Sequence, residues 1–211
     1  MIIDSITIIK YIVICILAYG LGNFATSFIV GKLSAGIDIR KHGSGNAGAT
    51  NTFRVLGLKM GAVVFLGDAL KGALAVLIGY LIAGENGKYI AGAFAVIGHI
   101  WPIALGFKGG KGVATTIGVM LAASPLYVLM IAPFGITLLV ISRYVSLSSV
   151  LGMIAMPTLM IIRGEGIVQI SFALVVSSIS IFAHRNNIVK LVKGTESRID
   201  FMKKKSSKEN N

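Results

Sequence analysis

Residues 126–141 read LYVLMIAPFGITLLVI, an apolar run without a charged side chain. The other apolar runs of the chain are residues 6–30, 58–83, 89–105, 113–123, 147–162 and 167–183. A helix needs about 20 mostly apolar residues to cross a bilayer, so runs of this kind predict membrane-spanning helices. We therefore expect an all-α integral membrane protein with about seven transmembrane helices.

The overall composition excludes a soluble globular protein. Of 211 residues, 55% are hydrophobic and only 13% are charged, and the mean hydropathy is +0.85. The net charge of +12 does not indicate a nucleic-acid partner, because the sequence has no soluble basic module to bind one. The single cysteine, Cys15, lies in an apolar run, and His, Asp and Glu form no cluster at ligand spacing. We therefore expect neither a metal ion nor another cofactor.

Lysine and arginine are concentrated in one of the two alternating sets of connections between the apolar runs. The poorer set contains only Lys10, Lys88 and Arg163. The richer set contains Lys32, Arg40, Lys41, Arg54, Lys59, Lys108, Lys111, Arg143 and the cations that follow residue 184. The positive-inside rule places the richer set in the cytoplasm. We therefore expect the N-terminus outside and the C-terminus in the cytoplasm.

The short connections leave no room for a large domain outside the membrane. We expect residues 1–198 to form a single membrane-embedded domain. Residues 199–211 are polar and rich in lysine. They predict a disordered cytoplasmic tail that touches anionic lipid.

The first cytoplasmic connection contains GSGNAGATN at residues 43–51, followed by Arg54. The segment matches the dinucleotide pattern G-x-G-x-x-G, but that pattern is meaningful only between a strand and a helix, and helices are expected on both sides here. Its glycines let backbone N–H groups turn toward one anion, while Ser44, Thr50, the asparagine amides and Arg54 add donors. This favours a phosphate cradle over the alternative, a flexible Gly/Ser connection.

The second connection reads FKGGKGVATT at residues 107–116 and leads directly into an apolar run. It is not a Walker A loop, because Leu105 stands where the first glycine should be and Gly112 follows the lysine. A glycine-rich turn at a helix N-terminus still suits a phosphate, since the helix dipole and the ammonium groups of Lys108 and Lys111 attract an anion. The alternative is a positively charged membrane anchor with ordinary turn glycines.

The third segment, HRNNIVKLVKGTESR at residues 184–198, follows the last apolar run. The helical spacing of Ile188, Leu191 and Val192 is also typical of an amphipathic helix that lies on the membrane surface with solvated cations. His184 and Asn187 stand one helical turn apart at the water boundary. They could point together into a site, where histidine can bind phosphate or carry a proton.

Two ionisable residues, Asp68 and Lys71, lie inside an apolar run at a spacing of i, i+3. Charges in lipid are costly, so we expect these side chains to form an ion pair. His99 lies near the cytoplasmic end of the next run and is expected to be a hydrogen-bonded residue of the bundle. We expect all three residues to support the structure from within the membrane. The alternative is that they take a direct part in function, because ionisable side chains inside a membrane often mark functional sites.

These motifs together resemble those of the bacterial acyl-phosphate:glycerol-3-phosphate acyltransferases (the PlsY family). The resemblance runs from about residue 37 to residue 198. Besides the three segments above, it includes Asp68 and Lys71 with Gly72, Gly98-His99 with Pro102, Arg143-Tyr144-Val145-Ser146 and Gly194-Thr195-Glu196.

The resemblance implies an enzyme of phospholipid biosynthesis in the bacterial inner membrane, with its active site on the cytoplasmic face. It would transfer a fatty acyl group from acyl phosphate to the 1-hydroxyl of sn-glycerol 3-phosphate, giving lysophosphatidic acid and inorganic phosphate. The implied partners are these two substrates, membrane lipid and the soluble enzyme that makes acyl phosphate.

The resemblance also implies roles for single residues. The catalytic residues would be Ser44, Arg54, Lys111, His184 and Asn187. With Ser149, these residues would hold glycerol 3-phosphate. The acyl phosphate would be cradled by Gly45, Asn46, Gly48, Thr50 and Asn51. The full substrate-binding set would be Gly43, Gly45, Asn46, Gly48, Thr50, Asn51, Lys108, Gly109, Gly110, Gly112, Thr115, Ser146, Ser149, Arg185 and Glu196.

An acyl phosphate has an excellent leaving group, so the acceptor hydroxyl could attack its carbonyl directly once both are held in place. No Ser–His–acid trio or active-site cysteine is visible in the sequence, which argues against a covalent acyl-enzyme. The proton acceptor is either His184 or the acceptor's own phosphate. The rival function is a membrane transporter of an organic phosphate. Against it, the anion-binding motifs all lie on one expected face and the sequence shows no inverted repeat.

Overall fold

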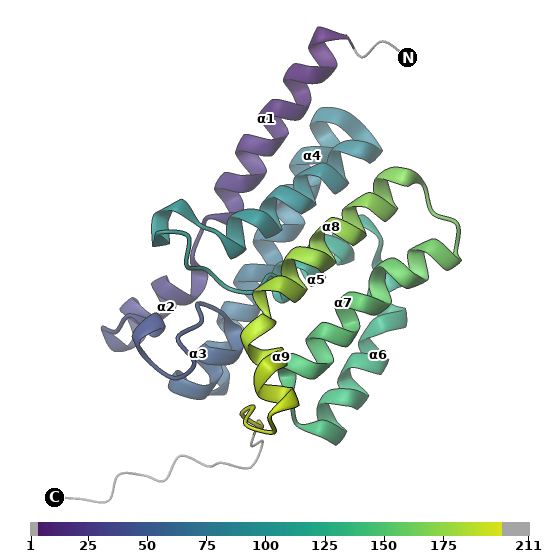
Figure 1. Ribbon diagram of the computed structural model, residues 1–211. Helices are drawn as coiled ribbons and strands as arrows, with labels where there is room; N and C mark the ends of the chain where they lie inside the picture. The colour runs from purple at the N-terminus through teal and green to yellow at the C-terminus, as the bar shows by residue number, and fades with distance from the viewer. Residues whose placement is uncertain (1–3, 200–211) are drawn as a thin grey trace, which may run out of the picture.

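The computed structural model describes residues 4–199, and every regular element within them is helical (Figure 1). The all-α fold class is therefore confirmed. Apart from Ile199, the expected tail at residues 199–211 lies outside the described residues. The elements are α1 (Ser5–Gly22), α2 (Thr26–Ala35), η1 (Ile39–Lys41), α3 (Ala49–Leu56), α4 (Leu58–Ile100), η2 (Ile103–Leu105), α5 (Val113–Ala123), α6 (Pro125–Ser142), α7 (Val145–Ile162), α8 (Ile167–Ala183) and α9 (Arg185–Val192).

The apolar run at residues 6–30 is not one continuous helix but divides into α1 and α2. α1 begins where Asp4 accepts a hydrogen bond from the backbone N–H of Thr7. It ends at Asn23, whose side-chain oxygen accepts from the backbone N–H of Ala104 at 3.2 Å. This contact with a distant segment fixes the chain where α1 gives way to α2.

α4 is a helical hairpin with two antiparallel arms. Ala83 and Gly84 leave helical geometry, and the positive φ of 63° at Gly84 suits glycine. A Cβ built on Gly79 would lie 2.3 Å from the carbonyl oxygen of Gly87, a contact that two residues eight positions apart cannot make in a straight helix. The expected helices at residues 58–83 and 89–105 are thus the two arms, and the second arm ends at Ile100.

By length and composition, the described residues contain four segments able to cross a membrane, or five if α8 and α9, bent by 60°, count as one span. The α4 hairpin is one of these four segments although it contains two of the predicted crossings. α5 has only 11 residues, which corresponds to ~16 Å of helix against a hydrocarbon core of ~30 Å. The predicted count of about seven is higher than four because it counts the two arms of α4 separately and includes α5 and α8.

Small residues bring α4 and α5 into close contact. A Cβ built on Gly118 would lie 1.9 Å from the carbonyl oxygen of Ala69, and one on Gly72 would lie 2.4 Å from that of Thr115. Glycine at both positions lets the two backbones approach as membrane helices do. The contact fixes the N-terminal end of α5 against the first arm of α4.

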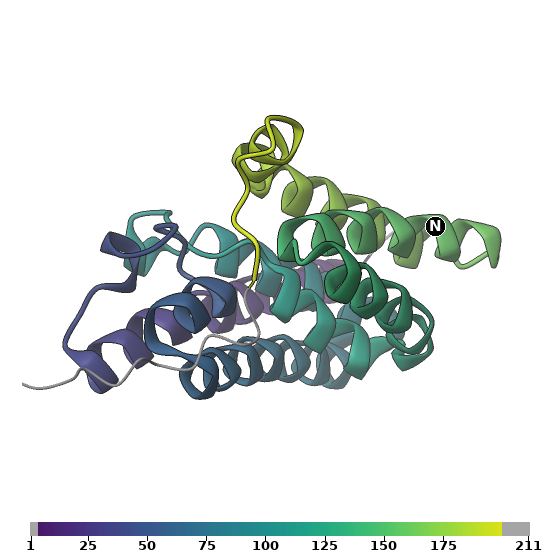
Figure 2. The same ribbon diagram turned by 90° about the horizontal axis from the view of Figure 1, so that it is seen from below.

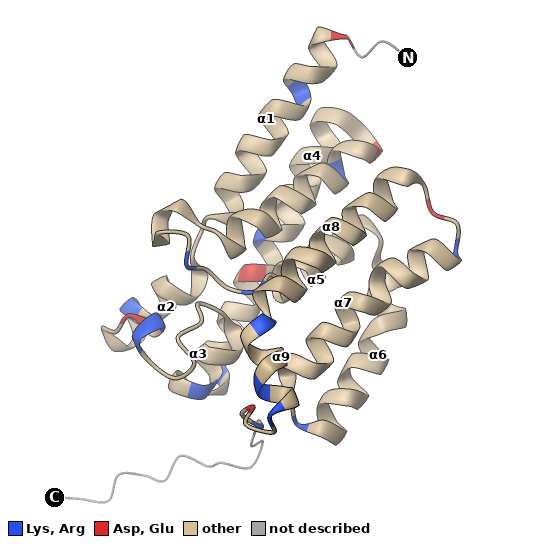
Figure 3. Ribbon diagram, in the orientation of Figure 1, with Lys and Arg blue, Asp and Glu red and all other residues tan. Residues whose placement is uncertain are grey.

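A buried apolar cluster joins α4 to α5, α6, α7 and α8, with Val96, Val119, Tyr127, Met160 and Val176 at its centre. The views in Figures 1 and 2 agree that α1–α3 lie on one side of the bundle and α6–α8 on the other. Figure 3 shows that Lys and Arg gather at the end of the bundle that carries α3 and α9. The segments predicted to bind phosphate therefore share the basic end.

Candidate active site

Loop 1, defined here as residues 42–48, is shaped by the side chain of Asn51. The Asn51 Oδ1 atom accepts from the backbone N–H of Ser44 at 2.8 Å and from its hydroxyl at 3.1 Å. Its Nδ2 atom donates to the carbonyl oxygens of Ile39 and His42 at 3.1 and 3.0 Å. Gly43 has a φ of 59°, and a Cβ there would lie 2.4 Å from Asn51 Oδ1. Asn51 is 1% exposed, so its amide holds the loop in shape.

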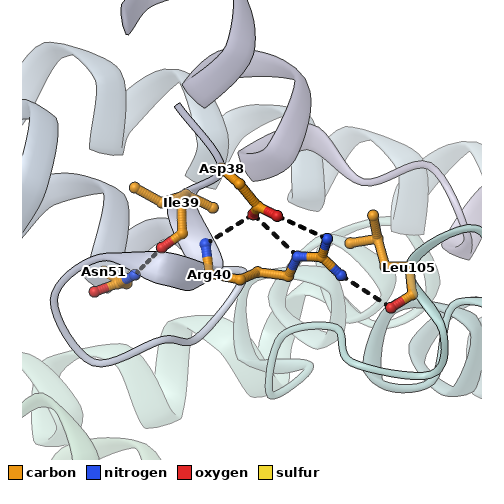
Figure 4. A network of polar contacts seen from close by, with 5 residues as sticks. All are labelled: Asp38, Ile39, Arg40, Asn51 and Leu105. Carbon is orange, nitrogen blue, oxygen red and sulfur yellow. Dashed lines mark hydrogen bonds and ion pairs between the residues drawn. The ribbon is translucent and has the colours of Figure 1, made fainter. Parts of the chain in front are cut away.

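Arg40, in η1 directly before loop 1, ties η1 to η2 (Figure 4). Its guanidinium makes two hydrogen bonds to the Asp38 carboxylate, at 3.0 and 2.8 Å, and its Nη1 atom donates to the carbonyl oxygen of Leu105 at 3.0 Å. The Arg40 guanidinium lowers the pKa of Asp38 to about 2. The sequence analysis treated Arg40 only as a cytoplasmic cation. The Asp38-x-Arg40 spacing was the available signal for a bidentate pair.

Loop 2, defined as residues 106–112, is fastened to the end of α4 by its own backbone. The N–H groups of Gly109 and Gly110 donate to the carbonyl oxygens of Ile100 and His99 at 3.2 and 3.1 Å. These two N–H groups therefore satisfy the last turn of α4 instead of facing an anion. A Cβ on Gly110 would lie 2.1 Å from Nε2 of His99, so glycine is needed for this close approach.

Lys111 is the first member of a chain of polar side chains that links loop 2 to α9 and α7. Its ammonium donates to Oδ1 of Asn187, and Nδ2 of Asn187 donates to Glu196 at 2.8 Å. Glu196 also accepts from the hydroxyl of Ser146 at 3.0 Å. Burial lowers the pKa of Lys111 to about 8, although the Glu196 carboxylate opposes the shift. The chain of hydrogen bonds therefore begins at the cation of Lys111 and joins loop 2 to α9, to the segment after α9 and to α7.

His184 lies just after the end of α8 and is 3% exposed. Its Nδ1 atom is 2.8 Å from the carbonyl oxygen of Ser180. A carbonyl oxygen can only accept, so Nδ1 carries the proton and Nε2 has a free lone pair. Burial, and then the charge of Lys111, lowers the pKa of His184 to about 4. The ring is therefore neutral near pH 7 and can accept a hydrogen bond or a proton at Nε2.

Arg54, on α3, reaches toward the same region. Its Nη2 atom donates to the carbonyl oxygen of Ser197 at 3.2 Å. Its Nε atom is buried and has no hydrogen-bond partner among the described residues. A buried charged donor without a partner is costly, and an anionic ligand would satisfy it.

The predicted site residues surround two neighbouring cavities. The first, of about 170 Å³, is lined by Ser44, Asn46, Gly48, Thr50, Asn51, Arg54, Lys111, Gly112, Ser146, Ser149, His184, Asn187 and Glu196, with Asp68 and His99. The second, of about 300 Å³, shares Ser44, Asn46, Lys111 and Asn187 and adds Gly45, Lys108, Gly109, Gly110 and Arg185. Two predicted substrate-binding residues line neither cavity: Gly43 and Thr115. Gly43 packs against Asn51, and Thr115 is fully buried.

A buried polar network lies behind the first cavity. The predicted ion pair between Asp68 and Lys71 is confirmed, with a distance of 2.9 Å. Thr26 donates its hydroxyl to Asp68 at 3.0 Å, and Lys71 donates to the carbonyl oxygen of Phe24 at 2.7 Å. His99 Nδ1 is 3.5 Å from Asp68. The network thus joins the break between α1 and α2 to both arms of α4.

An apolar groove of about 430 Å³ opens from the first cavity between α5, α6 and α7. Phe65, Val113, Val145 and Ser149 line both spaces. The sequence analysis did not foresee the groove, because its lining residues look like ordinary lipid-facing or core residues. The basic cavities and the apolar groove together form a site for a molecule with an anionic head and a long apolar chain.

Known proteins resemble this chain over most of its length. The sequence profile of the family described as Glycerol-3-phosphate acyltransferase matches residues 12–194. A glycerol-3-phosphate acyltransferase of Alkaliphilus metalliredigens is 50% identical over 188 residues, which is 89% of this chain and 95% of the relative. One of Clostridioides difficile is 48% identical over 200 residues, covering 91% and 97% of the two chains.

Two solved structures are also similar. A crystal structure of PlsY, an integral membrane glycerol 3-phosphate acyltransferase, in its glycerol 3-phosphate form has a TM-score of 0.85 and 37% sequence identity, and the match covers 90% of this chain and 96% of that chain. The lysophosphatidic acid form of that protein has a TM-score of 0.83 over 90% and 95% of the two chains.

Proposed function

Because the chain belongs to the glycerol-3-phosphate acyltransferase family, we propose that its acyl donor is a fatty acyl phosphate. The protein is an integral membrane enzyme that acylates glycerol 3-phosphate. This activity serves phospholipid biosynthesis. It replaces the rival hypothesis, a membrane transporter of an organic phosphate.

One observation carries the proposal: two polar cavities share Lys111 and Asn187, and one of them continues into an apolar groove. Acyl phosphate combines a dianionic head with a fatty chain, and glycerol 3-phosphate is a second, water-soluble anion. A reaction between them needs two anion sites that meet, one beside an apolar channel. This arrangement supports an acyl phosphate donor.

We assign the cytoplasmic face of the bacterial inner membrane to the end of the bundle that carries the site. The gathering of Lys and Arg at that end supports this orientation through the positive-inside rule (Figure 3). The C-terminus is then cytoplasmic and the N-terminus outside. Glycerol 3-phosphate and the soluble enzyme that makes acyl phosphate would reach the site from the same compartment.

In the proposed arrangement, Ser44, Arg54, Lys111, Ser149, His184 and Asn187 hold glycerol 3-phosphate. Gly45 and Gly48 of loop 1, with Asn46 and Thr50, hold the phosphate of the donor, and Asn51 keeps that loop in shape. The unpaired Arg54 Nε and the Lys111 ammonium supply the charge that two phosphates require.

The reaction is a direct acyl transfer. The 1-hydroxyl oxygen of glycerol 3-phosphate forms a bond to the donor's carbonyl carbon, and the bond from that carbon to the phosphate oxygen breaks. The hydroxyl proton goes to Nε2 of His184 or to the acceptor's own phosphate, and inorganic phosphate departs. Arg54 and Lys111 stabilise the charge that grows on the departing phosphate. Fixing both reactants side by side supplies much of the rate increase.

The donor is tested with purified protein in detergent, glycerol 3-phosphate and either myristoyl phosphate or myristoyl-coenzyme A. We expect lysophosphatidic acid and inorganic phosphate from the acyl phosphate and no product from the thioester. Product from the thioester alone would refute the proposed donor. Lys111→Ala should abolish turnover, whereas Lys59→Ala, which removes an exposed cation outside both cavities, should retain it.

A further inference from the structure

An aromatic side chain with a fixed position, that of Tyr127, lies at the far end of the apolar groove. Resting on the proposed function, we propose that Tyr127 limits the length of the fatty acyl chain that the enzyme accepts. The residue is part of no motif that the sequence analysis singled out, and it lies away from both anion-binding cavities.

The direction of the groove follows from the helices that form it. α5 and α7 lead away from the first cavity, and α6 leads back toward it. The lining residues farthest along these helices from the cavity are Met120 on α5, Tyr127 on α6 and Met156 on α7. These three side chains are buried and belong to the main apolar cluster, so they form the far end of the groove.

Tyr127 is a rigid wall rather than a movable side chain. It is 3% exposed and belongs to the main buried apolar cluster. Its hydroxyl donates a hydrogen bond to Glu165, in the connection between α7 and α8. The guanidinium of Arg163 lies 6.0 Å from the centre of its ring. Held on three sides, the ring cannot swing away easily to admit a longer chain.

The groove has the length of a common fatty chain. It is lined on α6 from Tyr127 to Leu139, and twelve residues of helix correspond to ~18 Å. With C–C bonds of ~1.5 Å in a zigzag, that length holds an extended chain of about fourteen carbons. Lipid tails outside the groove are as apolar as its walls, so the limit comes from steric exclusion at Tyr127 and not from hydrophobic transfer.

Gly152 offers a way to shorten the same groove. It lies on α7 between Ser149 and Met156, and a Cβ built on it would lie 3.7 Å from its closest neighbouring atom, Cγ2 of Ile131. A side chain can therefore be added at its base without a clash. A leucine there would project into the groove midway along its length.

The test measures kcat/KM for decanoyl, myristoyl, palmitoyl and stearoyl phosphate in detergent. Tyr127→Leu removes the end wall and should raise the ratio for stearoyl over myristoyl phosphate by about tenfold. Gly152→Leu should lower the ratio for palmitoyl over decanoyl phosphate by about tenfold. Tyr127→Phe loses the hydrogen bond to Glu165 but keeps the ring, which the buried apolar cluster still holds. It is the matched control, with the wild-type order of preference.

The outcomes separate this inference from the proposed function. Wild-type protein that uses no acyl phosphate would overturn the donor itself. If the wild type uses acyl phosphates but Tyr127→Leu and Gly152→Leu both keep its chain-length profile, Tyr127 does not set the limit. A purely structural defect would lower all four rates by the same factor and would likewise contradict the proposed role.

Discussion

Asn187 is held in one orientation by Glu196, because its Nδ2 atom lies 2.8 Å from the Glu196 carboxylate. A carboxylate only accepts hydrogen bonds, so the amide must present its oxygen on the opposite side. That oxygen accepts from the ammonium of Lys111. Glu196 carries the same negative charge as the substrates. It thus serves the site by orienting the neutral side chain of Asn187 and not by touching a phosphate.

Glu196→Gln should weaken this orientation. A glutamine can face Asn187 with either end of its amide, so Lys111 would lose its fixed acceptor. We expect kcat/KM for glycerol 3-phosphate to fall about tenfold or more, as is typical when a charged hydrogen bond is lost. Steady-state kinetics check this, with Glu85→Gln as the control at the exposed turn of α4. Equal kinetics in the two variants would contradict the assigned role.

The protonation of Lys111 predicts how substrate binding depends on pH. Its pKa is lowered to about 8, so the free enzyme loses this positive charge as the pH rises through that value. The substrate phosphate, with a second pKa of about 6, is already a dianion there. We therefore expect KM for glycerol 3-phosphate to rise between roughly pH 7 and 9.

The matching variant for this pH dependence is Lys111→Arg, which keeps its charge throughout that range. It should show a lower turnover because its shape differs, but a flatter KM profile. A wild-type KM that stays constant through the same range would show that the charge of Lys111 does not govern binding.

Gly110→Ala should displace loop 2. The added methyl group would lie 2.1 Å from Nε2 of His99 and 2.9 Å from the carbonyl oxygen of Ala47, and the loop must move to relieve both contacts. We expect kcat to fall at least about tenfold, since small misplacements of reacting groups are costly. Gly20→Ala is the control, because a Cβ there meets nothing within 4 Å. Full activity in Gly110→Ala would exclude tight packing of the loop as a requirement.

Arg40→Lys tests the link between η1, which leads into loop 1, and η2. An ammonium can pair with Asp38, but it cannot also reach Leu105 with the geometry of a guanidinium. We expect about a tenfold loss of kcat/KM from the looser loop. The rise of KM for glycerol 3-phosphate between roughly pH 7 and 9 should be unchanged, because Lys111 is intact. Arg143→Lys, at an exposed position, is the control. A kinetic profile equal to that control would show that loop 1 needs no such support.

Much of the fold could be predicted because its signals are local. Apart from the run at residues 6–30, which divides into α1 and α2, each apolar run became one helix or one arm of the α4 hairpin. The i, i+3 spacing of Asp68 and Lys71 correctly predicted their ion pair. The break between α1 and α2 could not be predicted. It depends on a contact between Asn23 and Ala104, which are far apart in the sequence.

The site shows the same division between local and distant contacts. Its three glycine-rich or basic segments were visible as motifs and line two adjoining cavities. Sequence reasoning could not separate residues that face the cavity from residues that hold the loop. By its residue type, Asn51 could donate a hydrogen bond to a phosphate. Its amide is instead occupied by hydrogen bonds with Ser44, Ile39 and His42. The role of Arg40 depends on Leu105, which lies outside loop 1.

The short length of α5 has a consequence for how the two reactants meet. α5 and α6 are joined at Ser124, and α6 has 18 residues against 11 for α5, so loop 2 stops ~10 Å below the level at which α6 ends. A water-soluble acceptor that binds at Lys111 meets the donor at the level of loop 2, while the fatty chain follows the groove between α5, α6 and α7. The acylated product is then formed already inserted in the bilayer, and it can depart sideways without crossing water.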